Sequence, residues 1–434
     1  YDIKRFQKFH SELGFIKKRI TETLGDLYGM HWPFKQHKTS RNIKTLPHHD
    51  NLKSFGACFG VSGGYERPMW FALDGEKAEY EYSYNYQSWY PSAEYETNNT
   101  VKNVGLFDLT PFSKFEIKSD KAHQELQKIC TANIKNEPGK CVYTHMLNSD
   151  GGIETDLTVV CVDKNHFRII SSAATRERDK FHINKHLSKN IELKDITDDL
   201  CVFGLFGPKS RDLLKTLSKD NFENDQFRFG FAKFITIDGV KIWTQRLSYV
   251  GELGYELYVD LKDAKKIYEL LIEKGKDFNL SNCGMHAMDI MRMESGFLHW
   301  GHDISPEENQ YQAGLAFTIS NKKDVDFIGK KALEKIKQDK VKTRFSMFTL
   351  KESEPGKPLL LHDEPIYDGE KIIGRSTSGN YSFNFKKNLV FGYINNDFSN
   401  EELQNKNLFI EVEKKKYPIE IINKPLKQTN FKNN

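Results

Sequence analysis

Apolar and polar residues alternate along most of the chain, and the period of this alternation changes from one segment to the next. A period of two, or a short continuous apolar run, predicts β-strands. Segments of this kind are 112–117, 141–147, 153–162, 241–247 and 255–259. Apolar residues spaced three and four apart predict helices instead, and they occur at 121–132, 210–217, 264–272 and 286–295. Antiparallel strands mixed with helices are typical of the α+β fold class.

The two ends of the chain follow other patterns. Near the N-terminus, Phe6–Tyr28 has the spacing of a helix within an otherwise polar stretch. The segment Tyr80–Tyr95 is dense in aromatic residues. Beyond Lys340 the pattern consists of short strands separated by Gly and Pro. We therefore expect an all-β domain without helices at the C-terminal end.

Composition narrows the class of protein. Only 38% of the 434 residues are hydrophobic, but they include 31 Phe and 19 Tyr, whose side chains are able to fill a large core. The 64 basic and 60 acidic residues give a formal net charge of +4, and this balance predicts no binding to nucleic acid. No run approaches the ~20 apolar residues of a membrane span, so we expect no membrane partner.

The cysteine spacing and the missing nucleotide motifs exclude further kinds of binding site. None of the six cysteines forms a C-x-x-C pair, so the sequence predicts neither a zinc site nor a redox pair. Buried thiols in a reducing compartment are expected instead. No G-x-G-x-x-G or Walker loop is present, so we expect no nucleotide cradle in this chain. His299, His302 and Asp303 are close in sequence, but this pattern is too weak to predict a metal.

A predicted hairpin carries the first candidate carboxylate. The turn Asn148-Ser-Asp-Gly-Gly joins two strands, and this composition is a strong hairpin signal. Asp156 follows the turn, and Tyr143 lies on the partner strand. Because Asp156 interrupts an apolar strand, it either satisfies the turn or stands at a pocket wall, as a base or as the stabiliser of a cation.

The segment Tyr249–Val259 carries the second candidate. Tyr255, Leu257 and Val259 alternate with Glu256, so Glu256 points to the face opposite this apolar trio. Two interpretations remain open at this stage. Glu256 either faces solvent or accepts a forked pair of hydrogen bonds from adjacent N–H donors of a ligand.

A series of short motifs runs in one order from about residue 100 to the C-terminal end. The motifs are Phe107-Asp-Leu-Thr, Tyr143-Thr-His-Met-Leu-Asn, Gly151-Gly-Ile-Glu-Thr-Asp-Leu, Ser172-Ala-Ala-Thr-Arg-Glu-Arg-Asp, Tyr249-Val-Gly-Glu-Leu-Gly-Tyr-Glu, Arg292-Met-Glu-Ser-Gly-Phe, Phe327-Ile-Gly-Lys, Glu364-Pro-Ile-Tyr, Thr377-Ser-Gly-Asn-Tyr-Ser and Phe391-Gly-Tyr-Ile. Each motif is short, but their common order is specific. The series resembles the folate-binding aminomethyltransferase family, which includes the glycine cleavage T-protein.

The block before residue 100 resembles one branch of that family. Phe55–Phe71 and Arg19–Pro33 are similar to the segment that joins the flavin domain to the folate domain in dimethylglycine and sarcosine dehydrogenases. The glycine-cleavage branch lacks this block. The resemblance therefore implies the C-terminal folate half of such a dehydrogenase, with the flavin domain absent from this chain.

Two departures support the dehydrogenase branch and locate the expected catalytic residue. Thr155 stands where the glycine-cleavage branch has its catalytic acid. The dehydrogenase branch uses a single Asp at the position of Asp156, so the resemblance implies that Asp156 is catalytic. An Arg that the glycine-cleavage branch uses for folate falls on Met288, which weakens the case for ordinary glycine cleavage.

The resemblance also implies a set of cofactor-binding residues. The glutamate that holds the pterin ring maps to Glu256, whose carboxylate suits the adjacent N–H donors of a pterin. The tyrosines of the pocket map to Tyr143 and Tyr249. Arg292 matches a further family position, where it either contacts the cofactor or has a structural role.

The implied fold is a cloverleaf of two α+β subdomains and a C-terminal β-barrel around a folate cavity. On this basis we expect a connecting region at 1–98, the folate-binding domain at 99–342 and the barrel domain at 343–434. The implied compartment is the cytoplasm, with the mitochondrial matrix as the alternative.

The implied function is tetrahydrofolate-dependent one-carbon transfer. A flavin dehydrogenase domain or subunit, the expected partner, would deliver the methyl-derived carbon of dimethylglycine or sarcosine as an iminium or as formaldehyde. Tetrahydrofolate would capture it as 5,10-methylenetetrahydrofolate, and FAD would belong to the separate or upstream flavin domain.

Three alternatives remain open: a glycine cleavage aminomethyltransferase, a sulfonium demethylase of the same fold, and a non-catalytic folate-binding or iron–sulfur-assembly paralogue. Paralogues of the last kind carry Lys-Gly-Cys-Tyr where this chain has Asp326–Lys330, and Phe55–Phe71 favours the amine branch over the sulfonium branch.

Overall fold

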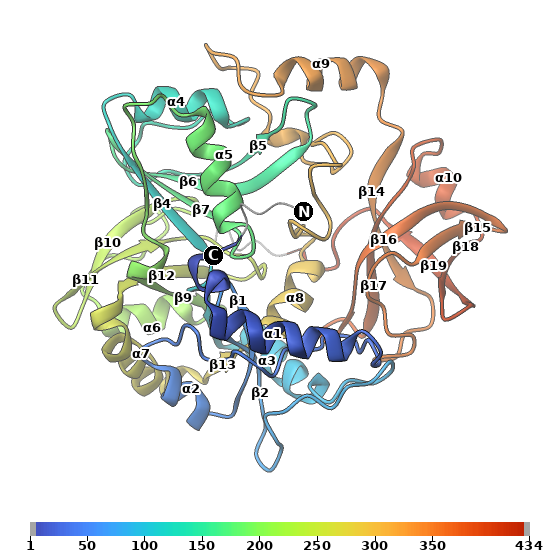
Figure 1. Ribbon diagram of the computed structural model, residues 1–434, viewed down its shortest axis with the longest axis horizontal. Coiled ribbons are helices and arrows are strands. Elements are labelled where there is room, and N and C mark those ends of the chain that lie inside the picture. Colours follow the sequence, from blue (N-terminus) through green and yellow to red (C-terminus); the bar gives the residue numbers. More distant parts are fainter. Residues whose placement is uncertain (1–5, 429–434) are drawn as a thin grey trace.

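Two β-sheets face each other in the larger part of the chain, and a closed barrel follows them. The computed structural model describes residues 6–428, and Figure 1 shows its units arranged about a common centre. Helices cover the outer faces of both sheets, so this part of the molecule has the layers helix, sheet, sheet and helix. The expected α+β class with a C-terminal barrel is confirmed.

The six-stranded sheet positions the Tyr249–Val259 segment. Its strands, in spatial order, are β10 (Ala232–Ile237), β11 (Val240–Gln245), β12 (Gly254–Asp260), β9 (Leu200–Phe206), β3 (Val104–Asp108) and β13 (Leu280–Cys283). Neighbouring strands are antiparallel, except for the parallel pair β13–β3. Its outer face is covered by α6 (Ser210–Leu217) and α7 (Leu261–Gly275). Tyr255, Leu257 and Val259 are buried beneath these helices, which confirms the alternation predicted for β12.

The five-stranded sheet positions the predicted hairpin. Its strands, in spatial order, are β5 (Cys141–Leu147), β6 (Ile153–Asp163), β7 (His166–Ser171), β4 (Ser113–Lys118) and β8 (Leu193–Asp195). All its pairs are antiparallel. On the outer face, α4 (Ala122–Ile129) and α5 (Arg176–His186) contribute Leu126 and Ile183 to an apolar cluster with Phe115 and Val159.

The inner faces of the two sheets meet in a second apolar cluster. Trp243 and Tyr258 of the six-stranded sheet pack there with Cys141 and Val160 of the five-stranded sheet. Tyr249 is only partly buried at the margin of this cluster. Polar side chains on these inner faces therefore lie between the sheets, and bulk solvent does not surround them.

The C-terminal barrel closes around its own core. Its strands, in order around the barrel, are β14 (Thr343–Leu350), β17 (Lys387–Asn395), β16 (Lys371–Ser382), β15 (Pro365–Asp368), β18 (Leu408–Val412) and β19 (Lys415–Ile422). Before the barrel come α8 (Met285–Glu294), η5 (Ala316–Thr318) and α9 (Lys330–Asp339).

The expectation that no helix follows Lys340 is wrong, because α10 (Asn400–Gln404) lies between two barrel strands. Ser399 and Glu402 cap this helix reciprocally through side chain and backbone. Such a capping box stabilises a helix that is too short to show a periodic pattern.

The N-terminal part packs along the two sheets and the barrel. Its elements are η2 (Lys8–Ser11), α1 (Leu13–Asp26), α2 (His49–Ser54), β1 (Ala57–Ser62), β2 (Tyr65–Phe71) and α3 (Tyr90–Lys102). The single helix predicted for Phe6–Tyr28 is interrupted at Glu12, which has an extended backbone. The aromatic segment Tyr80–Tyr95 runs into α3, which the pattern did not predict. Two further short turns of helix are η3 (Thr197–Asp199) and η4 (Lys276–Phe278).

Two expectations about the environment of the chain can be compared with the structure. All six cysteines are buried and free, as expected for unpaired thiols. Within residues 6–428, no helix is long and apolar enough to cross a membrane. The domain boundaries at residues 98 and 342 stay predictions.

Candidate functional site

The β5–β6 hairpin places Asp156 and Tyr143 on one face of the five-stranded sheet. Tyr143 pairs with Thr158 and His145 pairs with Asp156, so Tyr143 and Asp156 are diagonal neighbours. The Tyr143 hydroxyl donates a hydrogen bond to Asp156 Oδ2 at 3.3 Å. The predicted hairpin is confirmed, and it brings its acid and its tyrosine into contact.

The Gly-Gly turn holds this hairpin against the loop at Pro306. Gly151 has a φ of +87°, which favours glycine. A Cβ atom on Gly152 would lie 1.9 Å from the carbonyl oxygen of Pro306, so a larger residue does not fit there. The Asn148 side chain closes the turn by accepting the Gly152 N–H at 2.9 Å. The placement of Asp156 in the next strand therefore depends on two small residues.

Asp156 is a partly buried acid with little compensation. Burial raises the pKa of Asp156 to about 6, and the hydrogen bond from Tyr143 offsets only part of this rise. Tyr143 nevertheless keeps 40% of its surface exposed, so a ligand is able to reach its ring. At neutral pH most of the Asp156 carboxyl is ionised and able to accept a proton.

Glu256 projects from the middle of the six-stranded sheet toward the other sheet. It pairs with Gln245 of β11 and with Gly204 of β9. The Tyr258 hydroxyl donates a hydrogen bond to Glu256 Oε2 at 2.8 Å. Burial raises the pKa of Glu256 to about 7, and the hydrogen bond from Tyr258 lowers it by less. Within residues 6–428 this hydroxyl is the one hydrogen-bond partner of the carboxylate, so Oε1 is available to a ligand.

Gln245 and Tyr258 are site residues that sequence reasoning missed. Gln245 lies directly across from Glu256 on the same face, and its side chain is fully buried. Among the residues that the structure describes, neither Oε1 nor Nε2 of Gln245 has a hydrogen-bond partner. A buried amide without a partner costs free energy, so this strip of sheet has more polar groups than the protein satisfies. The period-two pattern places Tyr258 on the face of Glu256, but only the register reveals Gln245.

Tyr249 joins the loop before β12 to the region after α8. Its hydroxyl donates a hydrogen bond to the carbonyl oxygen of Leu298 at 2.9 Å. Its ring stacks on Phe297, with ring centroids 5.9 Å apart and planes 17° apart. Burial raises the pKa of Tyr249, and the negative charge of Asp156 adds to the rise. Tyr249 and Asp156 also both raise the pKa of Tyr143, after burial, so these three residues are electrostatic neighbours.

The four central candidates face one another across the space between the sheets. Cys141 lies on the same face of β5 as Tyr143. Burial raises the pKa of the Cys141 thiol, and the charge of Glu256 raises it further, so Glu256 faces the beginning of β5. The structure thus brings Asp156, Tyr143 and Tyr249 together, and Glu256 faces the start of the strand that carries Tyr143.

Arg292 lies on α8 and is engaged by protein groups. Its Nε atom contacts Asp289 Oδ1 at 2.9 Å, and Nη1 contacts Asp303 Oδ2 at 2.5 Å. Its Nη2 atom donates to the Ser378 hydroxyl at 2.8 Å. Burial disfavours the cation, but Asp289 and Asp303 raise the pKa of Arg292 above its ordinary value. These contacts join α8 to barrel strand β16 and support the structural role, while a contact with a cofactor stays a prediction.

The histidine pair near α8 does not form a metal centre with a third ligand. The rings of His299 and His302 lie 4.7 Å apart. Within residues 6–428, the one group of three possible metal ligands that lie close enough together is Glu22, Asp26 and His37. This group belongs to α1 and the loop after it, outside the space between the sheets.

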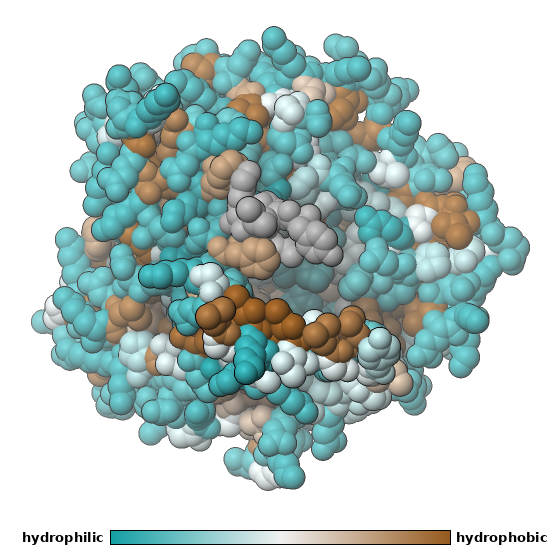
Figure 2. All heavy atoms as spheres, in the orientation of Figure 1, coloured by the Kyte–Doolittle hydropathy of each residue, from teal (hydrophilic) through white to brown (hydrophobic). Residues whose placement is uncertain are grey.

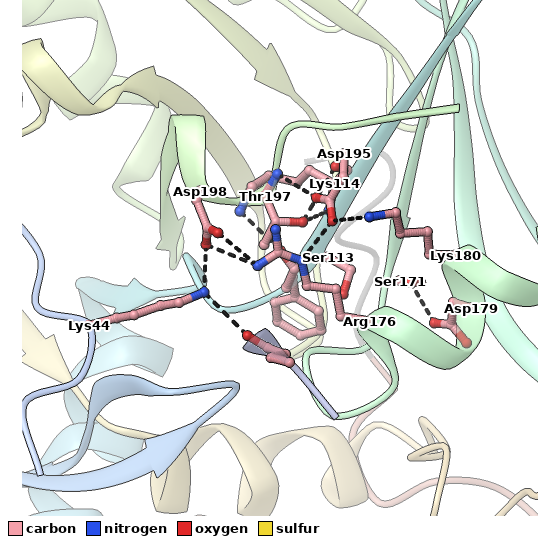
Figure 3. Close-up of polar contacts among 12 residues, drawn as sticks. Lys44, Ser113, Lys114, Ser171, Arg176, Asp179, Lys180, Asp195, Thr197 and Asp198 are labelled. Atoms are coloured by element: carbon pink, nitrogen blue, oxygen red, sulfur yellow. Dashed lines mark hydrogen bonds and ion pairs between the residues drawn. The ribbon is translucent and has the colours of Figure 1, made fainter. Parts of the chain in front are cut away.

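A second polar cluster holds α5 and the N-terminal segment against the five-stranded sheet (Figure 3). Arg176 donates to Asp195 Oδ2 at 2.9 Å and to Asp198 Oδ2 at 3.0 Å. Lys44 donates to Asp198 Oδ1 at 2.9 Å. Because each of these acids has a cationic partner, the cluster connects segments of the chain.

Two family models match consecutive parts of this chain. The GCVT N-terminal domain matches residues 48–323, and the glycine cleavage T-protein C-terminal barrel domain matches residues 344–427. A third, the FAD dependent oxidoreductase central domain, matches residues 1–45. The last match agrees with the resemblance of the N-terminal block to the flavin-linked branch.

Two relatives are named for N-methylated amino acids. A 4-methylaminobutanoate oxidase (formaldehyde-forming) from Paenarthrobacter nicotinovorans is 37% identical over 381 residues, which cover 88% of this chain and 46% of that protein. The mitochondrial dimethylglycine dehydrogenase of Rattus norvegicus is 32% identical over 370 residues, which cover 85% of this chain and 42% of that protein. The chain therefore spans less than half of the length of either relative.

A solved structure shows the same fold. The crystal structure of glycine cleavage system aminomethyltransferase T from Bartonella henselae matches with a TM-score of 0.75 and 21% sequence identity, over 88% of this chain and 98% of that chain. This match confirms the cloverleaf architecture that the resemblance implied. Together with the family models over residues 48–323 and 344–427, it shows that this chain belongs to the glycine cleavage T-protein (aminomethyltransferase) family.

Proposed function

We propose that this chain binds tetrahydrofolate between its two sheets and loads it with a one-carbon unit derived from an N-methyl group. The observation that supports this most strongly is a pair of poorly compensated carboxyl groups on facing sheets. Asp156 and Glu256 have pKa values raised by burial to about 6 and about 7. Acids of this kind suit a ligand with N–H donors at one end and a reacting amine at the other.

Glu256 is the proposed anchor of the pterin ring. A pterin offers adjacent N–H donors, and a carboxylate accepts such a pair as a forked hydrogen bond. The Tyr258 hydroxyl holds one oxygen of Glu256 at 2.8 Å and so limits its rotation. The amide of Gln245, next to Glu256 across the strands, is able to contact the remaining polar edge. The residues present therefore fit the ligand.

Asp156 is the proposed catalytic residue. Bound tetrahydrofolate supplies the amine nitrogens that take up the carbon. Asp156 accepts the proton released there, or stabilises a cationic iminium by its charge. A pKa of about 6 leaves it mostly ionised at pH 7 yet more basic than an exposed Asp. Tyr143 orients this carboxylate, and Tyr143 and Tyr249 line the ligand and exclude water.

The proposed carbon donor is the oxidised N-methyl group of dimethylglycine or sarcosine. A flavin dehydrogenase domain or subunit would deliver it as an iminium or as formaldehyde. The names of the two relatives support a methylated amino acid as the donor, and the match of residues 1–45 supports a flavin partner. Glycine cleavage is less well supported, because Thr155 and Met288 replace a catalytic acid and a folate-binding Arg of that branch.

We place this reaction in the cytoplasm, with the mitochondrial matrix as the alternative. The name of the Rattus norvegicus relative includes the word mitochondrial, which supports the matrix. The distinction does not alter the chemistry proposed for the site.

Calorimetric titration of tetrahydrofolate under anaerobic conditions tests the site. The matched variants are Glu256→Gln and Asp260→Asn, because both acids lie on β12 but Asp260 is exposed at the end of the strand. We expect Glu256→Gln to weaken binding roughly tenfold to a hundredfold, as for the loss of a charged hydrogen-bond acceptor. Asp260→Asn should retain the wild-type affinity.

Two results would contradict the proposal in different ways. Equal affinities for the wild type and both variants would show that Glu256 does not hold the pterin. Absence of tetrahydrofolate binding by the folded wild-type protein would reject the folate function itself.

A further inference from the structure

The first long helix of the chain turns its apolar side to water. In α1, Leu13, Ile20 and Leu24 are 83%, 51% and 56% exposed, and Leu27, just after its end, is 59% exposed. Their spacings of seven, four and three residues place them on one side of the helix. Figure 2 shows a brown stripe along the position of α1 on this face of the molecule. None of the α1 residues is buried.

The opposite, polar side of α1 is the side that contacts the rest of the protein. Arg19 donates to the carbonyl oxygen of Thr39 at 2.8 Å, and Glu22 accepts the Thr39 N–H at 2.9 Å. Asp26 forms an ion pair with Lys35 at 2.6 Å. A surface helix of a soluble protein ordinarily buries its apolar side and exposes its polar side. In α1 this orientation is reversed, which is the pattern of a helix whose apolar side packs against another protein surface.

One family match bears on what packs against this helix. The whole of α1 lies within residues 1–45, which match the central domain of FAD-dependent oxidoreductases. Both relatives are more than twice as long as the part that this chain matches. A segment that belongs by sequence to a flavoprotein domain, and exposes an apolar stripe, has its packing partner in such a domain.

We propose that the stripe of Leu13, Ile20, Leu24 and Leu27 is the docking surface for the flavin-binding domain of an amine oxidoreductase. This inference rests on the proposed function and names the surface through which the flavin partner is held beside the folate site. Polar contacts hold α1 to the folate-binding part, and apolar contacts hold the flavin-binding domain to α1. The helix thus connects the folate-binding part to the flavin-binding domain.

The test uses the full 434-residue chain and a defined flavoprotein probe. The probe is the portion of the Paenarthrobacter nicotinovorans relative that this chain does not match, produced with added FAD and used only if it retains the flavin. Sedimentation velocity and calorimetry should show a one-to-one complex. Ile20→Asp and Leu24→Asp should each weaken it about tenfold or more, as expected for an apolar anchor at an interface. Lys18→Ala, on another side of the same helix, should leave the affinity unchanged.

The aspartate variants should fold normally, because both side chains are already exposed in the wild type. Circular dichroism and tetrahydrofolate affinity verify this. Absence of a complex, or equal affinities for all variants, would overturn the docking surface. Two other results would also overturn it: self-association of the chain that the aspartate substitutions abolish, or binding to anionic phospholipid vesicles that they abolish.

The docking surface and the folate site can fail independently. A wild-type chain that binds the flavoprotein probe but not tetrahydrofolate would retain the surface and reject the proposed folate function. A chain that binds tetrahydrofolate but not the probe would retain the folate function and reject the docking surface.

Discussion

The space between the sheets and the junction of α8 with the barrel both contain buried charged groups, but their surroundings differ. At the junction, Arg292 is bound by Asp289, Asp303 and Ser378. In the central space, the carboxylates of Asp156 and Glu256 each receive one tyrosine hydroxyl from the described residues and no cation. The first group of charges is neutralised inside the protein, and the second is not.

On this difference rests the proposal that Arg292 is structural and that the two carboxylates bind a ligand. Pairing keeps Arg292 charged at any ordinary pH, since its acidic neighbours raise its pKa. Burial raises the pKa of the two carboxyl groups to about 6 and about 7, because the single tyrosine hydroxyl on each offsets only part of the rise. Buried acids that titrate near neutral pH and face an open space are characteristic of ligand sites. The predictions below test whether the contrast holds.

The largest expected effect is on catalysis by Asp156. Asp156→Ala should lower the enzyme-catalysed rate of one-carbon transfer roughly a hundredfold to ten-thousandfold, the range for loss of a general acid or base. Single turnovers, corrected for the uncatalysed condensation of formaldehyde with tetrahydrofolate, measure this rate. Tetrahydrofolate affinity should change little. A parallel loss of rate and affinity would instead show that Asp156 only positions the ligand.

The next effect is on stability at the junction. Arg292→Met leaves Asp303 buried without its cation, and breaking a buried ion pair costs about 3–5 kcal/mol. Urea unfolding measures this loss. The matched control is Arg375→Met, because Arg375 pairs with Asp363 at 2.6 Å where both side chains are about half exposed. The control should cost about 1 kcal/mol or less, and equal losses would contradict the contrast.

A smaller effect of the opposite sign is expected in the central space. The folded-state pKa of Asp156 lies above its ordinary value of 3.8, so ionisation of this group costs stability as pH rises through about 6. Asp156→Asn removes that cost and should stabilise the unliganded protein by about 1–3 kcal/mol above pH 7. Below pH ~4 the two proteins should be equally stable. Thermal unfolding across this pH range measures the difference, and a destabilised variant at pH 8 would contradict it.

The smallest effect concerns the pH dependence of folate binding. Glu256 must be ionised to accept a forked pair of hydrogen bonds, and its pKa in the free protein is about 7. Tetrahydrofolate affinity should therefore rise about tenfold between pH 6 and pH 8. Calorimetry at several pH values measures this rise. Glu256→Gln should bind weakly with a flat profile, and an unchanged slope in the variant would assign the titration to another group.

Local patterns predicted the elements with the clearest periodicity. Helix α6 and strand β5 have the predicted bounds, Ser210–Leu217 and Cys141–Leu147. The short helix α10 was missed because a capping box, and not a repeat of apolar residues, stabilises it. Periodicity predicts that α1 has an apolar stripe, but it does not say whether another element covers that stripe. The exposure of the stripe therefore could not be predicted.

The residues of the candidate site also divide into those that local patterns predict and those that they do not. Asp156 and Tyr143 were predicted on adjacent strands because a two-strand hairpin is a local structure. The alternation within one strand predicted which face of the strand carries Glu256. The opposing sheet shields Glu256 from solvent, and this packing between distant segments cannot be read from a local pattern. Gln245 enters the site only through the register of β11 with β12. Residue roles near the barrel depend on packing between distant segments, as the contacts of Arg292 with Ser378 illustrate.

The connection of the two sheets has a consequence for how the protein is made. All strands of the five-stranded sheet, from β4 to β8, lie in sequence between β3 and β9, which are neighbours in the six-stranded sheet. The inserted sheet has all its strands once residue 195 has left the ribosome, whereas the other sheet must wait for Cys283 at the end of β13. Because domains fold as their segments emerge during synthesis, we expect the nascent chain to form the sheet that carries Asp156 first. The six-stranded sheet, which carries Glu256, then assembles against it.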